Sequence, residues 1–273
     1  MNQESRVFTQ QAFALGGVAL LSVLLSTRVA FAENEDSCVE CHRDRNFLVT
    51  NKKLYDYFEQ WDASIHKRED VGCADCHGGN PAAPGKKQAH GKGVGVSDAA
   101  SGIYYKNVAE TCGQCHEDVL AGFQESDHYE QIEKEKDEEQ GPTCVTCHGS
   151  IDVSILDVNT VEAACARCHN EETDNFPENP AEAGRILNRF LAIHRFYRYV
   201  SIRAEPEEAR EFLLEVDTLH RKLVVTWHTF DLEQIEKETD ELLGVLKAKR
   251  DELKKKSKAI KQGKLDARSK ASK

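Results

Sequence analysis

The ten cysteines of this 273-residue chain fall into five pairs, each with two residues between its members. No cysteine is left over, and each pair is followed at once by a histidine. Two thiols at this spacing can form thioethers to both vinyl groups on one porphyrin edge, and the adjoining imidazole can then bind the iron. The five motifs are Cys38-x-x-Cys41-His42, Cys73-x-x-Cys76-His77, Cys112-x-x-Cys115-His116, Cys144-x-x-Cys147-His148 and Cys165-x-x-Cys168-His169.

Two other uses of paired cysteines explain the pattern less well. Zinc ribbons take two pairs per metal, whereas five is an odd number, and zinc does not require a histidine after each pair. Disulfides are common in exported proteins, but they give no reason for the five histidines. We therefore predict five covalently bound haem c groups, with the motif histidines as proximal ligands of the iron. The haems would also supply the apolar bulk that a chain with 30% charged and 7% aromatic residues lacks.

The second axial ligand of each iron must be sought among the other histidines, because Met1 is the only methionine. His–His ligation lacks the thioether that raises the potential of His–Met sites, so we predict low reduction potentials, suited to anaerobic respiration. Five irons need at most five of the six histidines outside the motifs, which are His66, His90, His128, His194, His220 and His228.

An internal repeat assigns two of these six. Residues 38–78 and 112–149 both read haem motif, short helix with an aromatic residue (Phe58 in one, Phe123 in the other), Ser-x-His, Gly, haem motif. A duplicated two-haem module explains this economically. It makes His66 and His128 equivalent distal ligands, the alternative being that each is a surface or packing histidine.

The other four histidines differ in context. His90 lies in a Gly/Lys-rich loop, where it either binds iron or is solvated. His194 lies on the apolar stripe of a predicted helix, which favours a side chain that faces the haems. His220 and His228 are eight residues apart on a second helix and so point about 80° apart. We expect His228 to be a ligand and His220 to be the spare.

We expect a mainly α fold with extensive loops, wrapped around five haems and divided into four segments. Residues 1–32 read as a signal peptide, with Arg6, an apolar run too short to span a membrane and Ala30-x-Ala32 before the cleavage point; an uncleaved anchor is the alternative. Residues 33–172 form the pentahaem-binding domain. Residues 181–253 form a helical hairpin that supplies distal histidines, its second helix beginning at Pro206. Residues 254–273 are a basic tail, either solvated or an electrostatic docking arm.

The charge of the chain argues against one class of partner. The formal net charge is −11, and removing Arg6, Arg28 and Glu4 with the signal peptide leaves about −12. Haem propionates add further negative charge, so no nucleic-acid partner is expected.

The chain resembles the multihaem cytochrome c superfamily over about residues 36–170. That superfamily includes the tetrahaem cytochromes c of nitrification, the membrane-anchored quinol dehydrogenases of nitrate and nitrite respiration, and the hydroxylamine oxidoreductase lineage. The resemblance implies haems in van der Waals contact that form an electron wire. The residues that carry it are Ser64-Ile65-His66 before Cys73-Ala74-Asp75-Cys76-His77-Gly78-Gly79, Ala89-His90 before the third motif, and Ser126-Asp127-His128.

One departure bears on function. The pentahaem nitrite reductases carry one Cys-x-x-Cys-Lys site, whereas all five motifs here end in histidine. We therefore expect an exported electron carrier, periplasmic or on the outer surface, with no catalytic residues. Its redox partners would be proteins such as a membrane quinol dehydrogenase or a terminal reductase, and homo-oligomers are allowed. The alternatives are a small nitrogen-oxide or oxyanion reductase with one open haem, and a membrane-anchored quinol-oxidising subunit.

The sequence predicts that the purified protein carries five haems. Its intact mass should exceed that of the polypeptide, taken from the mature N-terminus found by sequencing, by five haem groups. An intact mass without such an addition would contradict covalent attachment altogether.

Overall fold

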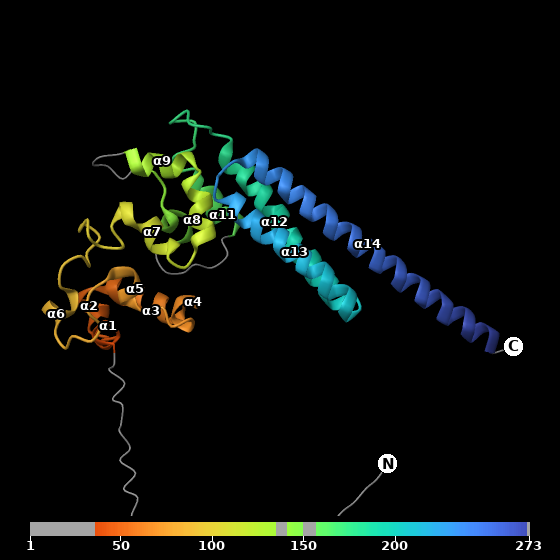
Figure 1. Ribbon diagram of the computed structural model, residues 1–273, viewed down its shortest axis with the longest axis horizontal. Coiled ribbons are helices and arrows are strands. Elements are labelled where there is room, and N and C mark those ends of the chain that lie inside the picture. The colour runs from red at the N-terminus through yellow and green to blue at the C-terminus, as the bar shows by residue number, and fades with distance from the viewer. Residues whose placement is uncertain (1–35, 135–140, 150–156, 272–273) are drawn as a thin grey trace, which may run out of the picture. The chain divides into compact units, whose positions relative to one another are not determined.

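The computed structural model describes residues 36–134, 141–149 and 157–271, and the expected signal peptide lies outside these ranges. All regular structure in the described residues is helical, which confirms the mainly α fold class (Figure 1). None of the helices described is long and apolar enough to cross a lipid bilayer.

Short helices make up the part of the chain that contains the five motifs. They are joined by turns and loops, so each motif is held by local structure. The elements are α1 (Ser37–His42), α2 (Phe47–Thr50), α3 (Lys52–Ala63), α4 (Ile65–Arg68), α5 (Cys73–His77), α6 (Lys86–His90), the 3₁₀ helix η1 (Tyr105–Asn107), α7 (Val108–Gly113), α8 (Glu117–Gln124), α9 (Asp127–Lys134), α10 (Cys144–His148) and α11 (Val158–Cys165).

Local hydrogen bonds explain why three motifs start a helix. The side chain of Asp36 caps α1 by accepting a hydrogen bond from the Cys38 N–H at 2.8 Å. Inside the second motif, Asp75 accepts from the Gly72 N–H at 2.7 Å, and Thr146 of the fourth motif accepts from the Thr143 N–H at 3.0 Å. The residue before the second cysteine thus closes the first turn of α5 and of α10.

Three long helices follow the motifs: α12 (Asn179–Arg203), α13 (Pro206–Trp227) and α14 (Leu232–Ala271). Figure 1 shows α14 beside the other two, and it contacts both. Their buried apolar side chains form one core that includes Ile186, Val216 and Leu246. Ion pairs join the helices at the surface, such as Arg189 to Glu236 at 2.7 Å and Lys256 to Glu208 at 3.0 Å.

The C-terminal part differs from the expected hairpin in one respect. The second helix does not continue to about Leu253; it ends at Trp227, and the chain reverses before Leu232. Phe230 lies in this turn with a φ of 58°, a backbone conformation that a bulky residue rarely adopts. The reversal creates a third helix, which takes in most of the expected basic tail and ends at Ala271.

The packing of α14 predicts unequal effects for two neighbouring substitutions. Leu246 is fully buried among the three helices, whereas Val245 is 38% exposed. Leu246→Ala should lower the free energy of unfolding by about 2–5 kcal/mol because it leaves a cavity. Val245→Ala, the matched control, should change it by less than about 0.5 kcal/mol. Urea titration of the haem-loaded protein, followed by circular dichroism, measures both; equal losses would contradict this packing.

Candidate functional site

The five cysteine motifs lie beside one another in chain order. Cys38 of the first motif is close enough to Cys73 of the second for their charges to interact, and Cys76 of the second is similarly close to Cys112 and Cys115 of the third. Cys112 of the third motif lies close to Cys144 of the fourth, and Cys147 of the fourth lies close to Cys165 of the fifth. No disulfide joins any of the ten.

Burial raises the pKa of several of the thiols. Burial, with a hydrogen bond to Asp36 as the second cause, raises the pKa of Cys38 to about 12. Burial also raises the pKa of Cys73 and of Cys147 to about 11. The hydrogen bond between Cys112 and Cys144 raises the pKa of Cys112 and lowers that of Cys144. Reactive cysteines have depressed pKa values, so a nucleophilic role fits Cys38, Cys73 and Cys147 poorly.

Three motif histidines each face a histidine from elsewhere in the chain. The ring centres of His42 and His90 are 6.2 Å apart. Those of His169 and His128 are 5.9 Å apart. The third pair, His148 and His228, is separated by 6.2 Å and its rings are nearly parallel. Each pair joins a proximal candidate to a distal candidate.

These separations fit an iron atom held between the two rings. Two imidazoles that bind one metal from opposite sides have ring centres about 6 Å apart, since each metal–nitrogen bond is about 2 Å long. Ring contacts without a metal candidate have the same range, from 4.5 Å for His128 and Phe230 to 6.2 Å for Phe123 and Phe230. The three pairs are distinguished because each joins a motif histidine to a histidine outside the motifs at a separation that axial ligands of one iron would have.

Hydrogen bonds orient two of the six rings. Nδ1 of His169 lies 2.8 Å from the carbonyl oxygen of Asn175, and Nδ1 of His228 lies 2.7 Å from that of Val224. A proton on Nδ1 donates to the carbonyl and leaves the lone pair of Nε2 for a metal. By contrast, Nδ1 of His128 and of His148 is buried without a hydrogen-bond partner in the described residues.

The turn after α13 is held by a buried carboxylate. Glu238 of α14 accepts hydrogen bonds from Lys222, Thr226 and Gln234 at 2.7–2.8 Å. Burial acts to raise the pKa of Glu238, but these donors outweigh it and lower the pKa. The network ties the end of α13 to the start of α14, and so fixes the position of His228.

Two phenylalanines with unusual backbones flank the pair of His128 and His169. The ring of Phe230 packs against His128, and the ring centre of Phe176 lies 6.4 Å from that of His169. Both residues have a positive φ, 58° for Phe230 and 46° for Phe176. Positive φ is costly for a bulky residue and is maintained only where the surroundings impose it.

The repeat seen in the sequence is present in the structure. The Ser64 hydroxyl donates to the carbonyl three residues before it and accepts from the N–H three residues after it, and Ser126 does the same. The carbonyls belong to Trp61 and Phe123, both buried. Trp61, and not Phe58 as aligned from the sequence, is thus the counterpart of Phe123. His66 and His128 follow their serines at the same distance, as expected for equivalent positions.

The remaining histidines are arranged differently. His66 is half-buried and, in the described structure, faces no other ring. In the same described residues, no contact between aromatic rings involves His77 or His116. Val94 forms a backbone hydrogen bond to His77. His194 and His220, expected as one ligand and one spare, face each other with ring centres 5.2 Å apart.

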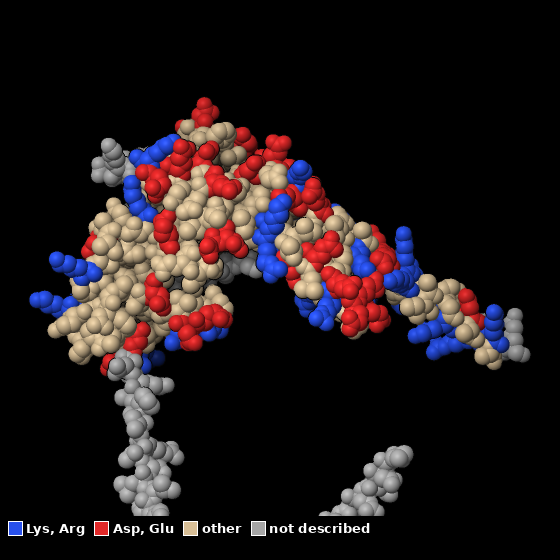
Figure 2. Space-filling view, in the orientation of Figure 1, with Lys and Arg blue, Asp and Glu red and all other residues tan. Residues whose placement is uncertain are grey.

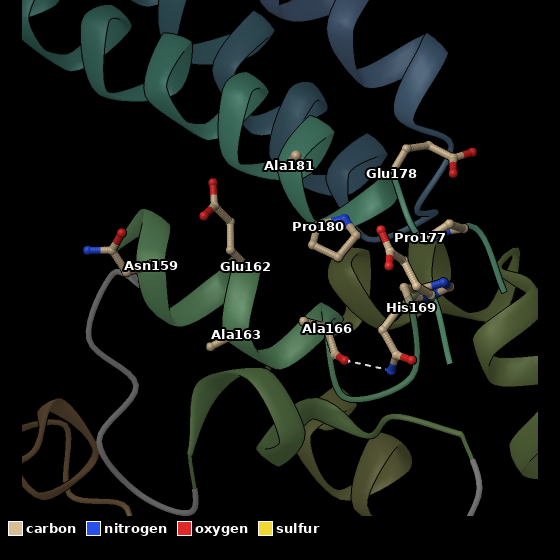
Figure 3. A pocket seen from close by; sticks show the side chains of 11 residues that line it. Asn159, Glu162, Ala163, Ala166, His169, Pro177, Glu178, Pro180 and Ala181 are labelled. Carbon is tan, nitrogen blue, oxygen red and sulfur yellow. Dashed lines mark hydrogen bonds between the residues drawn. The ribbon is translucent and has the colours of Figure 1, made fainter. Parts of the chain in front are cut away.

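An open hollow of about 770 Å³ adjoins the fifth motif (Figure 3). Figure 3 shows His169 on one side of it, with Glu162 of α11 and Pro180 of α12 nearby. Asn170 anchors the loop after the motif by donating to the Ala166 carbonyl at 3.0 Å.

Three supporting residues were not found from the sequence. The carbonyls of Asn175 and Val224 cannot be identified there, because every residue has one. Phe176 carried a weak signal, since an aromatic residue seven positions after a motif histidine, just before Pro177, is close enough to pack against its ring.

Residues 99–170 match the family model described as cytochrome c7 and related cytochrome c. This stretch, which includes the third, fourth and fifth motifs, is therefore a cytochrome c7-type multihaem cytochrome c domain. Covalently bound haem c and electron transport follow from that family. No solved structure matches the chain.

Removal of a facing imidazole should alter one haem only. His128→Ala should convert one haem of the oxidised protein from low-spin to high-spin, because its iron loses an axial ligand. Asp127→Asn, at the preceding and exposed position, should leave all haems as they were. Electron paramagnetic resonance of the two purified variants makes the comparison; an unchanged spectrum for His128→Ala would contradict the pairing with His169.

Proposed function

We propose that the chain is an exported electron carrier with five low-potential c-type haems in an anaerobic respiratory chain. The observation that carries the proposal is the spacing of three histidine pairs, His42 with His90, His128 with His169 and His148 with His228, as axial ligands of iron. Haem c supplies one-electron redox chemistry, and the chain supplies attachment, axial ligands and order. The c7-type domain accounts for three of the five motifs.

The order of the motifs supports transfer along the chain. Neighbouring thiols belong to successive motifs, so successive porphyrin edges would be attached close to one another. One-electron transfer needs such proximity and no acid, base or nucleophile. The two imidazoles that backbone carbonyls orient, those of His169 and His228, fit this requirement.

Charge on the surface supports docking to a protein partner. Figure 2 shows Lys and Arg side chains along the C-terminal part of α14 and acidic side chains where α12 meets α13. From Lys254 to Lys273 the chain has nine basic residues and one acid, Asp266. Such an arm would speed encounter with an acidic redox protein and would act more weakly at high salt.

A second function is favoured by the histidines that lack a facing ring. His77 and His116 lie in motifs two and three, and His66 alone remains to serve both when His194 and His220 face each other. One of the two irons would then keep an open position, which is what binding of a small oxyanion or nitrogen oxide requires. The chain would in that case be a small reductase that receives electrons through the other haems.

One experiment distinguishes the carrier from the reductase. For the carrier, the oxidised protein should show mainly low-spin haem by electron paramagnetic resonance, with at most one high-spin haem because His66 alone remains for His77 and His116. It should also accept electrons at all its haems without consuming nitrite or hydroxylamine. A high-spin signal together with turnover of either compound would contradict the carrier and favour the reductase. Protein-film voltammetry measures the potentials, which should be low throughout.

A further inference from the structure

His194 and His220 approach each other in a way that differs from the three haem pairs. Their ring centres are 5.2 Å apart, against 5.9–6.2 Å for the pairs that include a motif histidine. Neither belongs to a Cys-x-x-Cys-His motif. They lie on adjacent helices, His194 on α12 and His220 on α13, so two firm elements fix their separation.

The shorter distance corresponds to two ligands that bind one metal at a tetrahedral angle. Two imidazoles on opposite sides of a metal have ring centres about 6 Å apart, but two ligands of a tetrahedral metal, with bonds of about 2 Å, have centres about 5 Å apart. A Zn²⁺ ion between the Nε2 or Nδ1 atoms of these two rings would therefore fit the separation as found. An iron held by both rings as axial ligands would not.

The donor atoms agree with this geometry. Nε2 of His220 is buried and has no hydrogen-bond partner in the described structure, and a buried polar atom of this kind calls for an ion or a water. Burial and the neighbouring His194 lower the pKa of His220, against an opposing effect of Asp217.

Other groups around the pair are suited to complete a site. Asp217 lies one helical turn before His220 and interacts with it electrostatically, and its carboxylate accepts a hydrogen bond from Tyr197. Phe190 packs edge-on against His220, at 6.1 Å between ring centres. His194 is exposed, which leaves a path from solvent.

We propose that His194 and His220 form a binding site for a divalent transition-metal ion, separate from the haems. The described residues contain no preassembled group of three or more His, Cys, Asp or Glu ligands, so water completes the coordination, or Asp217 does after a change of rotamer. Imidazole suits Zn²⁺, Cu²⁺ and Ni²⁺. The bound ion would clamp α12 to α13, which together position His228.

Titration of the haem-loaded protein with Zn²⁺ tests the proposal. Isothermal calorimetry should detect one site that His194→Ala and His220→Ala each weaken at least tenfold. Arg195→Ala and Arg221→Ala, at the neighbouring exposed positions, are the matched controls and should bind as the parent does. Electron paramagnetic resonance should find the haem spin states unaltered in all four variants.

Two results would overturn the proposal. One is Zn²⁺ affinity that is the same in His194→Ala and His220→Ala as in the controls. The other is a new high-spin haem signal in either histidine variant, which would make that residue an axial haem ligand. Because calorimetry with Zn²⁺ does not measure electron transfer, failure here is distinguishable from failure of the carrier function.

Discussion

Three pairs of facing histidine rings, with ring centres 5.9–6.2 Å apart, are the contacts on which the motif-bearing part of the chain depends. Each of the three pairs joins residues that are remote in the chain, with His148 and His228 eighty positions apart. A metal bound by both rings of a pair would cross-link the two segments that carry them. The motif-bearing part has little apolar core of its own, its buried cluster including Ala109, Phe123 and Ile132, so such cross-links would contribute much of its stability.

The long C-terminal helices provide what the short ones lack. Their shared core, with Ile186, Val216 and Leu246 fully buried, is the largest apolar cluster in the described residues. α13 contacts α8, and the turn after it brings His228 opposite His148 and Phe230 against His128. A conventional helical core thus positions His228 opposite His148 of the fourth motif, and Phe230 against His128, which faces His169 of the fifth.

The sequence predicted what local chemistry determines. Pro206 marked the start of α13, and the repeated Ser-x-His identified two equivalent turns. Three of the five cysteine motifs lie within residues 99–170, which match the cytochrome c7 family model. The sequence did not predict the reversal before Leu232, because apolar residues recur at helical spacing across it and no glycine or proline marks it. The sequence also did not predict that His194 would face His220. Periodicity shows which face of a helix a residue lies on, but not which residue of the neighbouring helix it contacts.

The most direct test of the account is the location of iron in the haem-loaded protein. Anomalous diffraction at the iron absorption edge from crystals of the purified protein gives each iron position independently of the polypeptide. The account predicts iron midway between the rings of His42 and His90, of His128 and His169, and of His148 and His228. Iron absent from those positions, with the same rings in place, would contradict it.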